Sequence, residues 1–266
     1  MGIDYVIDYE CVPKQELTSL GIMERLKAKQ RAQAVIKLYR DRGDMRPPSE
    51  MGFEMVRRVA DGSEEVQVIV VQDMLNDAAP LDSLRTHCAG CPANVLDKPF
   101  GCFNTINYPI SQQAEVWLLK RLPTPEDPLI FLLVQQAVQD IQPNSELAEQ
   151  IGSMRSRPGV FFQSSEVLGR RYDEMTITTN HIFQLLFLPE SINPAYGSLL
   201  LLLFNAIPRD MDAEHLMQLA SSTPDRDIPL LIEDELGDDQ TLADIKDFLR
   251  AVHRAHALHV TLSLDA

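Results

Sequence analysis

The sequence predicts an α+β fold, with an antiparallel sheet in the first half of the chain and mostly helices in the second half. Residues 3–9 alternate apolar and polar side chains, which is the period of a β-strand. Residues 51–60 and 64–73 flank the turn Asp61-Gly62-Ser63 and are rich in apolar and β-branched side chains, as the two strands of a hairpin are. After residue 128 helical patterns take over.

The first half also contains two predicted helices and one further strand. Residues 16–42 have a helical composition, and Gly43 is expected to end that helix. Ser111 is expected to cap a helix over 112–122, because a serine hydroxyl accepts a hydrogen bond from an amide of the first turn. Residues 105–110 fit a short strand. The apolar stripe of the first helix consists of Ala28, Ala32, Val35, Ile36 and Tyr39.

A Pro-rich stretch at 123–128 is the best candidate for a domain boundary, because proline cannot continue a helix. We therefore expect an α+β region over 1–124, which carries the cysteines, and a mostly helical region over 125–266. The alternating run 260–264 predicts a last strand, and its pairing with the N-terminal strand would make the chain one continuous domain. Other predicted elements are helices at 129–141, 145–154, 179–188, 195–206, 212–221 and 240–257, and a strand at 159–163.

Composition limits the partners and the location of the protein. The net charge of -15 works against non-specific binding to nucleic acid or anionic lipid, so nucleic acid is expected only at a local basic helix. No apolar run approaches the roughly 18 residues of a membrane span, which predicts no membrane partner. The N-terminus lacks the basic start and apolar core of a secretory signal, so we predict a cytoplasmic protein. We also expect a protein partner, because the first functional hypothesis below is a regulatory or interaction protein.

All four cysteines fit a single metal site. Cys88 and Cys91 form a CxxC pair, Cys102 follows within the same Gly- and Pro-rich stretch, and Cys11 comes directly after the first predicted strand. In a reducing compartment such cysteines indicate metal or redox chemistry rather than structural disulfides. Buried free thiols are the alternative, since free cysteine is among the most buried residue types. His87, beside Cys88, is a candidate substitute ligand for zinc, but the favoured interpretation is an exposed loop residue.

Both a 4Fe-4S cluster and a zinc ion are held by four cysteines. Zinc sites usually take two CxxC-like pairs, whereas this chain has one pair and two irregularly spaced cysteines. This spacing favours a 4Fe-4S cluster slightly over a zinc ion.

One cysteine upstream of a group of three resembles the layout in iron-sulfur nucleases of the RecB-like kind. Those nucleases also carry an acid-x-lysine motif for a catalytic metal. The candidate strand here reads Glu64-Glu65-Val66-Gln67-Val68 and lacks the lysine. The resemblance therefore covers the cysteine spacing and does not imply nuclease activity.

Two basic groups are candidate anion sites. Positions 22–46 hold eight basic and three acidic residues, with Lys27 and Arg31 among the basic ones. Arg170 and Arg171 belong to a second group, with Arg155 and Arg157, that is interleaved with aromatic residues, a combination suited to phosphate contact and stacking. The alternatives are a solvated helix face for the first group and a packed core for the aromatics of the second.

The helix at 240–257 ends near three histidines, His253, His256 and His259. We interpret them as a solvated helix end, where histidine suits the helix dipole.

No nucleophile elbow, Gly-rich phosphate loop or HExxH motif is present, so the sequence leaves open whether the protein is an enzyme. The first functional hypothesis is a non-catalytic regulatory, sensing or interaction protein built around the metal site. The second is an iron-sulfur enzyme or electron-transfer component that acts on an anionic substrate.

Overall fold

The computed structural model describes residues 2–58, 64–140, 146–172, 175–187, 190–210, 212, 214, 217, 219 and 228–265. These residues form two compact units. The inserted unit consists of Glu10–Cys91 and Lys98–Phe100. The sheet unit consists of Met1–Tyr9, Pro92–Asp97 and Gly101–Ala266, so both sides of the Pro-rich stretch at 123–128 belong to it.

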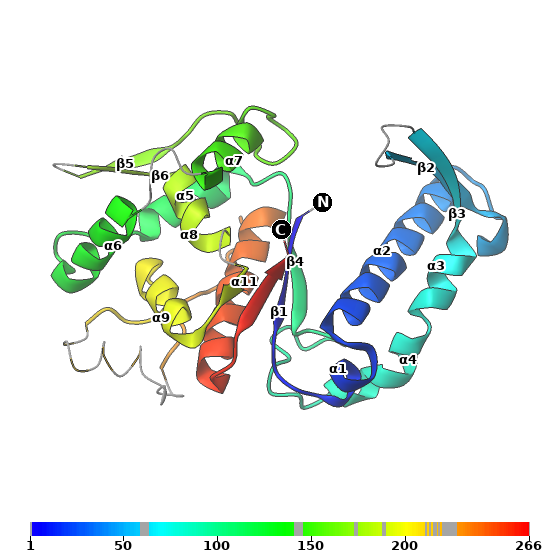
Figure 1. Cartoon of the computed structure of the whole chain (residues 1–266), viewed down its shortest axis with the longest axis horizontal. Coiled ribbons are helices and arrows are strands. Elements are labelled where there is room, and N and C mark those ends of the chain that lie inside the picture. Colours follow the sequence, from blue (N-terminus) through cyan, green and yellow to red (C-terminus); the bar gives the residue numbers. More distant parts are fainter. Residues whose placement is uncertain are drawn as a thin grey trace. The chain divides into compact units, whose positions relative to one another are not determined.

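The sheet unit is built on a four-stranded antiparallel sheet with the strand order β4-β1-β8-β7. β1 and β4 of this sheet are labelled in Figure 1. Tyr5 of β1 lies opposite Asn104 of β4 on one side and opposite Leu264 of β8 on the other. The N-terminal strand is therefore an inner strand, and its predicted pairing with the C-terminal strand is confirmed. The strands are β1 (Gly2–Ile7), β4 (Phe103–Asn107), β7 (Ser191–Ile192) and β8 (Leu262–Asp265).

Helix α11 (Gln240–Leu258) packs on this sheet and against α9 (Pro194–Leu203). The Asp239 carboxylate caps α11 by accepting a hydrogen bond from the Leu242 amide, and His259 ends the helix in a left-handed conformation. The described residues of the unit also form α5 (Gln112–Arg121), α6 (Pro128–Asp140), α7 (Glu146–Arg155), α8 (Thr179–Phe187) and the hairpin of β5 (Gly169–Arg171) and β6 (Thr176–Thr178).

Aromatic side chains form a continuous series through the core of the sheet unit. Tyr5 of β1 meets Phe248 of α11 edge-on, with ring centroids 5.3 Å apart. Phe248 contacts Phe187, which stacks on Phe183 of the same helix, and Phe183 contacts Phe162. The series ties the sheet to α8 and to the loop that follows α7.

The inserted unit begins with α1 (Val12–Leu17) and the long helix α2 (Ser19–Asp41). The Thr18 hydroxyl accepts a hydrogen bond from the Gly21 amide and starts α2 as an N-cap. A small core of Ala32, Met51, Val71 and Met74 holds α2 against the elements that follow. These are η1 (Pro48–Glu50), the antiparallel hairpin β2 (Gly52–Arg58) and β3 (Glu64–Val70), α3 (Val71–Ala78), α4 (Pro80–Leu84) and η2 (Arg85–Cys88).

The α+β class is confirmed, with most strand residues in the first half and a helical second half. Three local predictions were wrong. The second hairpin strand stops at Val70, because Val71, Met74 and Ala78 recur at helical spacing and are buried in α3. The predicted helix over 16–42 is divided at Thr18, whose backbone leaves the helical region with φ 62°. Within 159–163 Phe162 forms only isolated bridges.

Some predicted features lie outside the described residues, namely the turn Asp61-Gly62-Ser63 and most of the helix at 212–221. None of the helices in the described part of the chain combines the length and the apolar character that a membrane span needs.

Candidate functional site

The CxxC pair lies in a tight turn of the inserted unit. The Cys91 amide donates a hydrogen bond to the Cys88 carbonyl oxygen at 3.3 Å, which closes the turn. Ala89 has φ -67° and ψ 123°, and Gly90 has φ +72°, the two central conformations of a type II turn. A type II turn favours glycine at its third position because φ is positive there. Gly90 is thus the residue that lets the two cysteines approach.

A backbone amide from the other end of the cysteine loop reaches Cys88. Phe100 belongs to the inserted unit, and its amide donates a hydrogen bond to Cys88 Sγ at 3.2 Å. Phe100 is buried and has φ 59°, a conformation that non-glycine residues rarely adopt. An amide aimed at a cysteine sulfur stabilises the thiolate, which is the form of cysteine that binds metals.

The thiol of Cys11 lies close enough to Cys88 to change its pKa, although the two are far apart in the sequence. Burial is the main cause that raises the pKa of Cys88, and the Phe100 amide opposes it. The charges of Cys91 and Cys11 raise this pKa further, because three neighbouring thiolates repel one another. The same part of the inserted unit holds all three cysteines, because α1, which Cys11 precedes, contacts η2, which ends at Cys88.

Cys102 belongs to the sheet unit and is buried directly before β4. Its carbonyl oxygen accepts a hydrogen bond from the Ile7 amide at 3.1 Å. Cys102 follows Phe100 by two residues, so the covalent chain limits the distance between their Cα atoms to about 7 Å. Within the described residues, no three His, Cys, Asp or Glu side chains are arranged as ligands of one metal ion. The four-cysteine ligand set stays a prediction.

The basic residues of α2 are divided between internal contacts and solvent. Lys29 forms an ion pair with Asp82 of α4 at 2.9 Å, and Arg25 donates to the Gly21 carbonyl oxygen of its own helix. Lys27 is half-buried and Arg31 is exposed, and their four-residue spacing places them on one face of α2. Anion binding at Lys27 and Arg31 stays a prediction.

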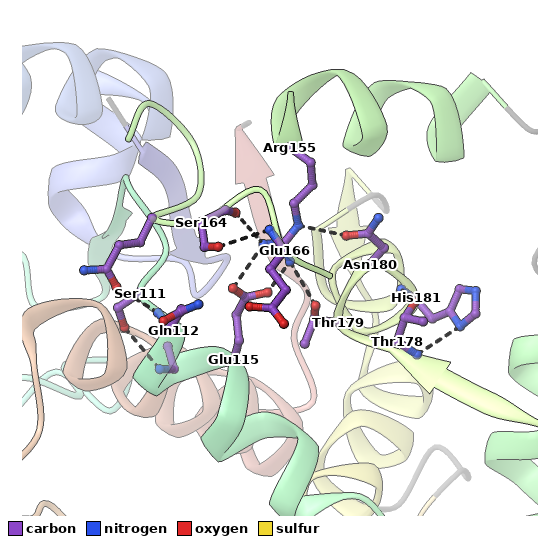
Figure 2. Close-up of polar contacts among 12 residues, drawn as sticks. Ser111, Gln112, Glu115, Arg155, Ser164, Glu166, Thr178, Thr179, Asn180 and His181 are labelled. Atoms are coloured by element: carbon purple, nitrogen blue, oxygen red, sulfur yellow. Dashed lines mark hydrogen bonds and ion pairs between the residues drawn. The ribbon is translucent and has the colours of Figure 1, made fainter. Parts of the chain in front are cut away.

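Arg155, from the second basic group, lies in the core of the sheet unit (Figure 2). Its guanidinium forms a two-point ion pair with Glu115 of α5. It also donates to Thr179 Oγ1 at 2.9 Å and to Asn180 Oδ1 at 3.0 Å, both on α8. The guanidinium carbon lies 3.7 Å from the centroid of the Phe162 ring, in cation–π geometry.

This arrangement has the character of a structural junction rather than a binding site. Every nitrogen of the Arg155 guanidinium donates a hydrogen bond, and the charge is balanced by Glu115. The junction connects α5, α7 and α8. The sequence marked Arg155 as basic but contained no signal for its partner, because Glu115 lies on a separate helix.

Arginines also bind the carbonyl groups at the ends of α5 and α9. Arg170 donates to the carbonyl oxygens of Leu119 and Leu122, at 3.4 and 2.9 Å. Arg209 donates to the Leu202 carbonyl oxygen at 2.7 Å and pairs with Asp127. Such contacts satisfy carbonyls that have no partner within a helix.

Arg170 and Arg171 also line a cavity of about 480 Å³ in the sheet unit. Phe131 of α6 and Tyr172 form part of its wall, with ring centroids 5.0 Å apart. Burial raises the pKa of Tyr172, and the positive charges of Arg170 and Arg209 oppose that rise. Here the second basic group keeps the combination of arginine and aromatic residues that suggested anion binding.

Two of the three histidines, His253 and His256, point inward, contrary to the predicted solvated helix end, whereas His259 at the end of the helix is exposed as predicted. His256 is buried, and its Nε2 lies 3.2 Å from the carbonyl oxygen of Leu219. His253 Nε2 lies 2.9 Å from the carbonyl oxygen of Ile228. Burial lowers the pKa of both side chains. The polar character of histidine favoured the wrong prediction, whereas a single carbonyl partner is enough to satisfy a neutral ring in the core.

Comparison with known proteins gives no match: no protein-family model, no curated protein and no solved structure is similar to this chain.

Proposed function

We propose that this chain is a metal-binding protein whose ligands are the thiolates of Cys11, Cys88, Cys91 and Cys102. The observation that carries the proposal is the contact of α1 with η2, because Cys11 directly precedes α1 and Cys88 ends η2. The Phe100 amide, directed at Cys88 Sγ, adds the kind of outer contact that metal-bound thiolates receive. Cys102 follows Phe100 by two residues in the sequence.

A set of four cysteine thiolates suits both a zinc ion and a 4Fe-4S cluster. Thiolates are soft ligands that suit zinc and iron-sulfur clusters and suit magnesium or calcium poorly. We place a 4Fe-4S cluster ahead of zinc, because there is one CxxC pair and the other two cysteines are irregularly spaced. The chain's own residues supply four thiolates, a buried environment at Cys88 and an amide donor to its sulfur.

The proposed role is regulatory, sensing or interaction rather than catalytic. Four thiolates saturate a zinc ion and leave no open position for a substrate. A metal bound by Cys11 and Cys91 would close most of the inserted unit into a loop, which lowers the entropy of the unfolded chain. Loss of the metal would then loosen this unit, and such a change is a basis for sensing redox state or iron supply.

The test is purification of the full chain without oxygen, followed by an absorbance spectrum and assays for iron, sulfide and zinc. Cys91→Ser removes one proposed ligand. His87→Ala is the matched control, because His87 is exposed and lies beside Cys88 without belonging to the proposed ligand set. Iron and sulfide of about four each per chain, lost in Cys91→Ser and kept in His87→Ala, would support a cluster.

One zinc per chain with the same response to the two variants would support the site and change the metal. Protein that contains neither iron nor zinc in stoichiometric amount would overturn the proposal.

A further inference from the structure

The cavity beside β5 has a fixed charged wall. Arg170 forms part of this wall, and its donations to the carbonyl oxygens of Leu119 and Leu122 hold its guanidinium in place. Tyr172 is held in the same way, because its hydroxyl donates to the Pro123 carbonyl oxygen at 2.9 Å. A wall anchored to backbone is already ordered before a ligand arrives, which reduces the entropy lost on binding.

Arg171 contributes a positive charge that the described residues do not neutralise. Its side chain is exposed and lines the cavity, and it forms no ion pair within the part of the chain that the structure describes. The contrast with Arg155 is direct, since Arg155 has a buried carboxylate as its partner. In a chain with a net charge of -15, Arg171 offers an anion a local point of attraction.

The rest of the wall suits an apolar group. Phe131, Pro125 and Met175 present aromatic and aliphatic surface, and Gln135 adds an amide that can donate or accept a hydrogen bond. A cavity of about 480 Å³ lies within the range of about 300–1,000 Å³ typical of small-molecule sites. The combination is a partly open cavity with apolar surface on its wall and the two arginines among its lining residues.

From these observations we infer that the cavity binds a small organic anion with an apolar body, whose carboxylate pairs with Arg171. The apolar body lies against Phe131 and Met175, and a planar carboxylate matches the two-point geometry of a guanidinium. This inference is independent of the metal site, because it rests on residues of the sheet unit alone.

The experiment uses two probes of the same shape, 2-naphthoate and the neutral 2-naphthalenemethanol, titrated into the full chain by calorimetry. Arg171→Ala removes the cation, and Arg171→Gln keeps much of its length without charge. Arg157→Ala is the control, because Arg157 is an exposed arginine of the same unit that does not line the cavity. Circular dichroism checks that each variant is folded.

We expect the Kd of 2-naphthoate to rise about tenfold in both Arg171 variants, a loss of about 1.4 kcal/mol, and to stay unchanged in Arg157→Ala. The neutral probe is expected to bind more weakly than 2-naphthoate and to be insensitive to Arg171. The inference is overturned if 2-naphthoate fails to bind at millimolar concentration, if its Kd is the same in the Arg171 variants, or if the neutral probe binds equally well.

Discussion

Arg155 and Glu115 form a two-point ion pair in the core of the sheet unit, where their side chains are 4% and 0% exposed. Desolvating two charges is costly, and here the cost is offset by the pairing and by the further donations to Thr179, Asn180 and the Ser164 carbonyl oxygen. Removing one partner therefore leaves the other charge buried and unbalanced.

We expect Arg155→Met to lower the free energy of unfolding by about 3–5 kcal/mol, because it leaves the Glu115 carboxylate buried in the core without an ion-pair partner. The double variant Glu115→Leu/Arg155→Met removes both charges and should recover most of that loss. Urea unfolding followed by circular dichroism measures both. Arg157→Met, at an exposed position, is the control. A single variant that costs less than about 1 kcal/mol would show that the pair is not buried as described.

Glycine-to-alanine changes should have opposite signs at two positions. Gly90→Ala is expected to destabilise the protein by about 1 kcal/mol and to reduce its bound metal, because alanine is strained at φ +72°. Gly152→Ala is the matched control inside α7, where an added methyl group meets nothing within 4 Å. It should stabilise the protein by about 0.4–1 kcal/mol. Thermal unfolding and metal analysis of both variants test this, and equal effects would argue against the type II turn.

Burial of His256 should make stability depend on pH. Its pKa lies below the ordinary value of 6.5 in the folded protein, mainly because burial disfavours the charged ring. As the pH falls below 6.5 the unfolded chain takes up a proton that the folded chain resists, so this contribution to stability is complete above pH 6.5 and is lost below it.

We expect the stability of the wild type to fall more steeply between pH 7 and 5.5 than that of His256→Gln, by up to about 1.4 kcal/mol per pH unit. Arg157→Gln, at an exposed position outside α11, should keep the wild-type slope. Urea unfolding at several pH values gives the three slopes. Parallel slopes for the wild type and His256→Gln would contradict a neutral buried ring.

Metal removal should destabilise the inserted unit if Cys11 is a ligand. We expect treatment with a chelator and a thiol reductant to lower the thermal midpoint by at least about 5 °C, on the order of 2 kcal/mol. Cys11→Ser should reproduce the lower midpoint without chelator, because it opens the loop from the N-terminal side. A chelated protein with an unchanged midpoint would mean that the thiols do not hold the unit together.

Features set by local chemistry were predictable from the sequence. The strand alternation of residues 3–9 and the turn chemistry of the first hairpin led to β1 and to β2–β3, and Ser111 caps α5 through a hydrogen bond from the Ala114 amide. The CxxC pair was visible because its two cysteines lie within one turn.

Features set by tertiary contacts were not predictable in this way. The sequence pattern predicts Val71 in a strand, but Val71 lies in helix α3 and is buried against α2. From the sequence, charged and polar side chains such as those of Arg155 and His256 are expected to be exposed. In the structure both are buried, and each has a polar partner from another segment, a carboxylate for Arg155 and a carbonyl oxygen for His256. Residues of α6 form part of the cavity beside Arg171, and the sequence does not indicate which elements α6 packs against.

The strand order of the sheet determines when each strand can pair with its neighbours during synthesis. β1 is translated before the other strands of the sheet, but one of its two neighbours, β8, is translated after all of them. The residues of the inserted unit all lie between β1 and β4 in the sequence. The ribosome therefore delivers a complete inserted unit while β1 still has an open edge, and that edge stays available to other chains until Leu262–Asp265 emerge.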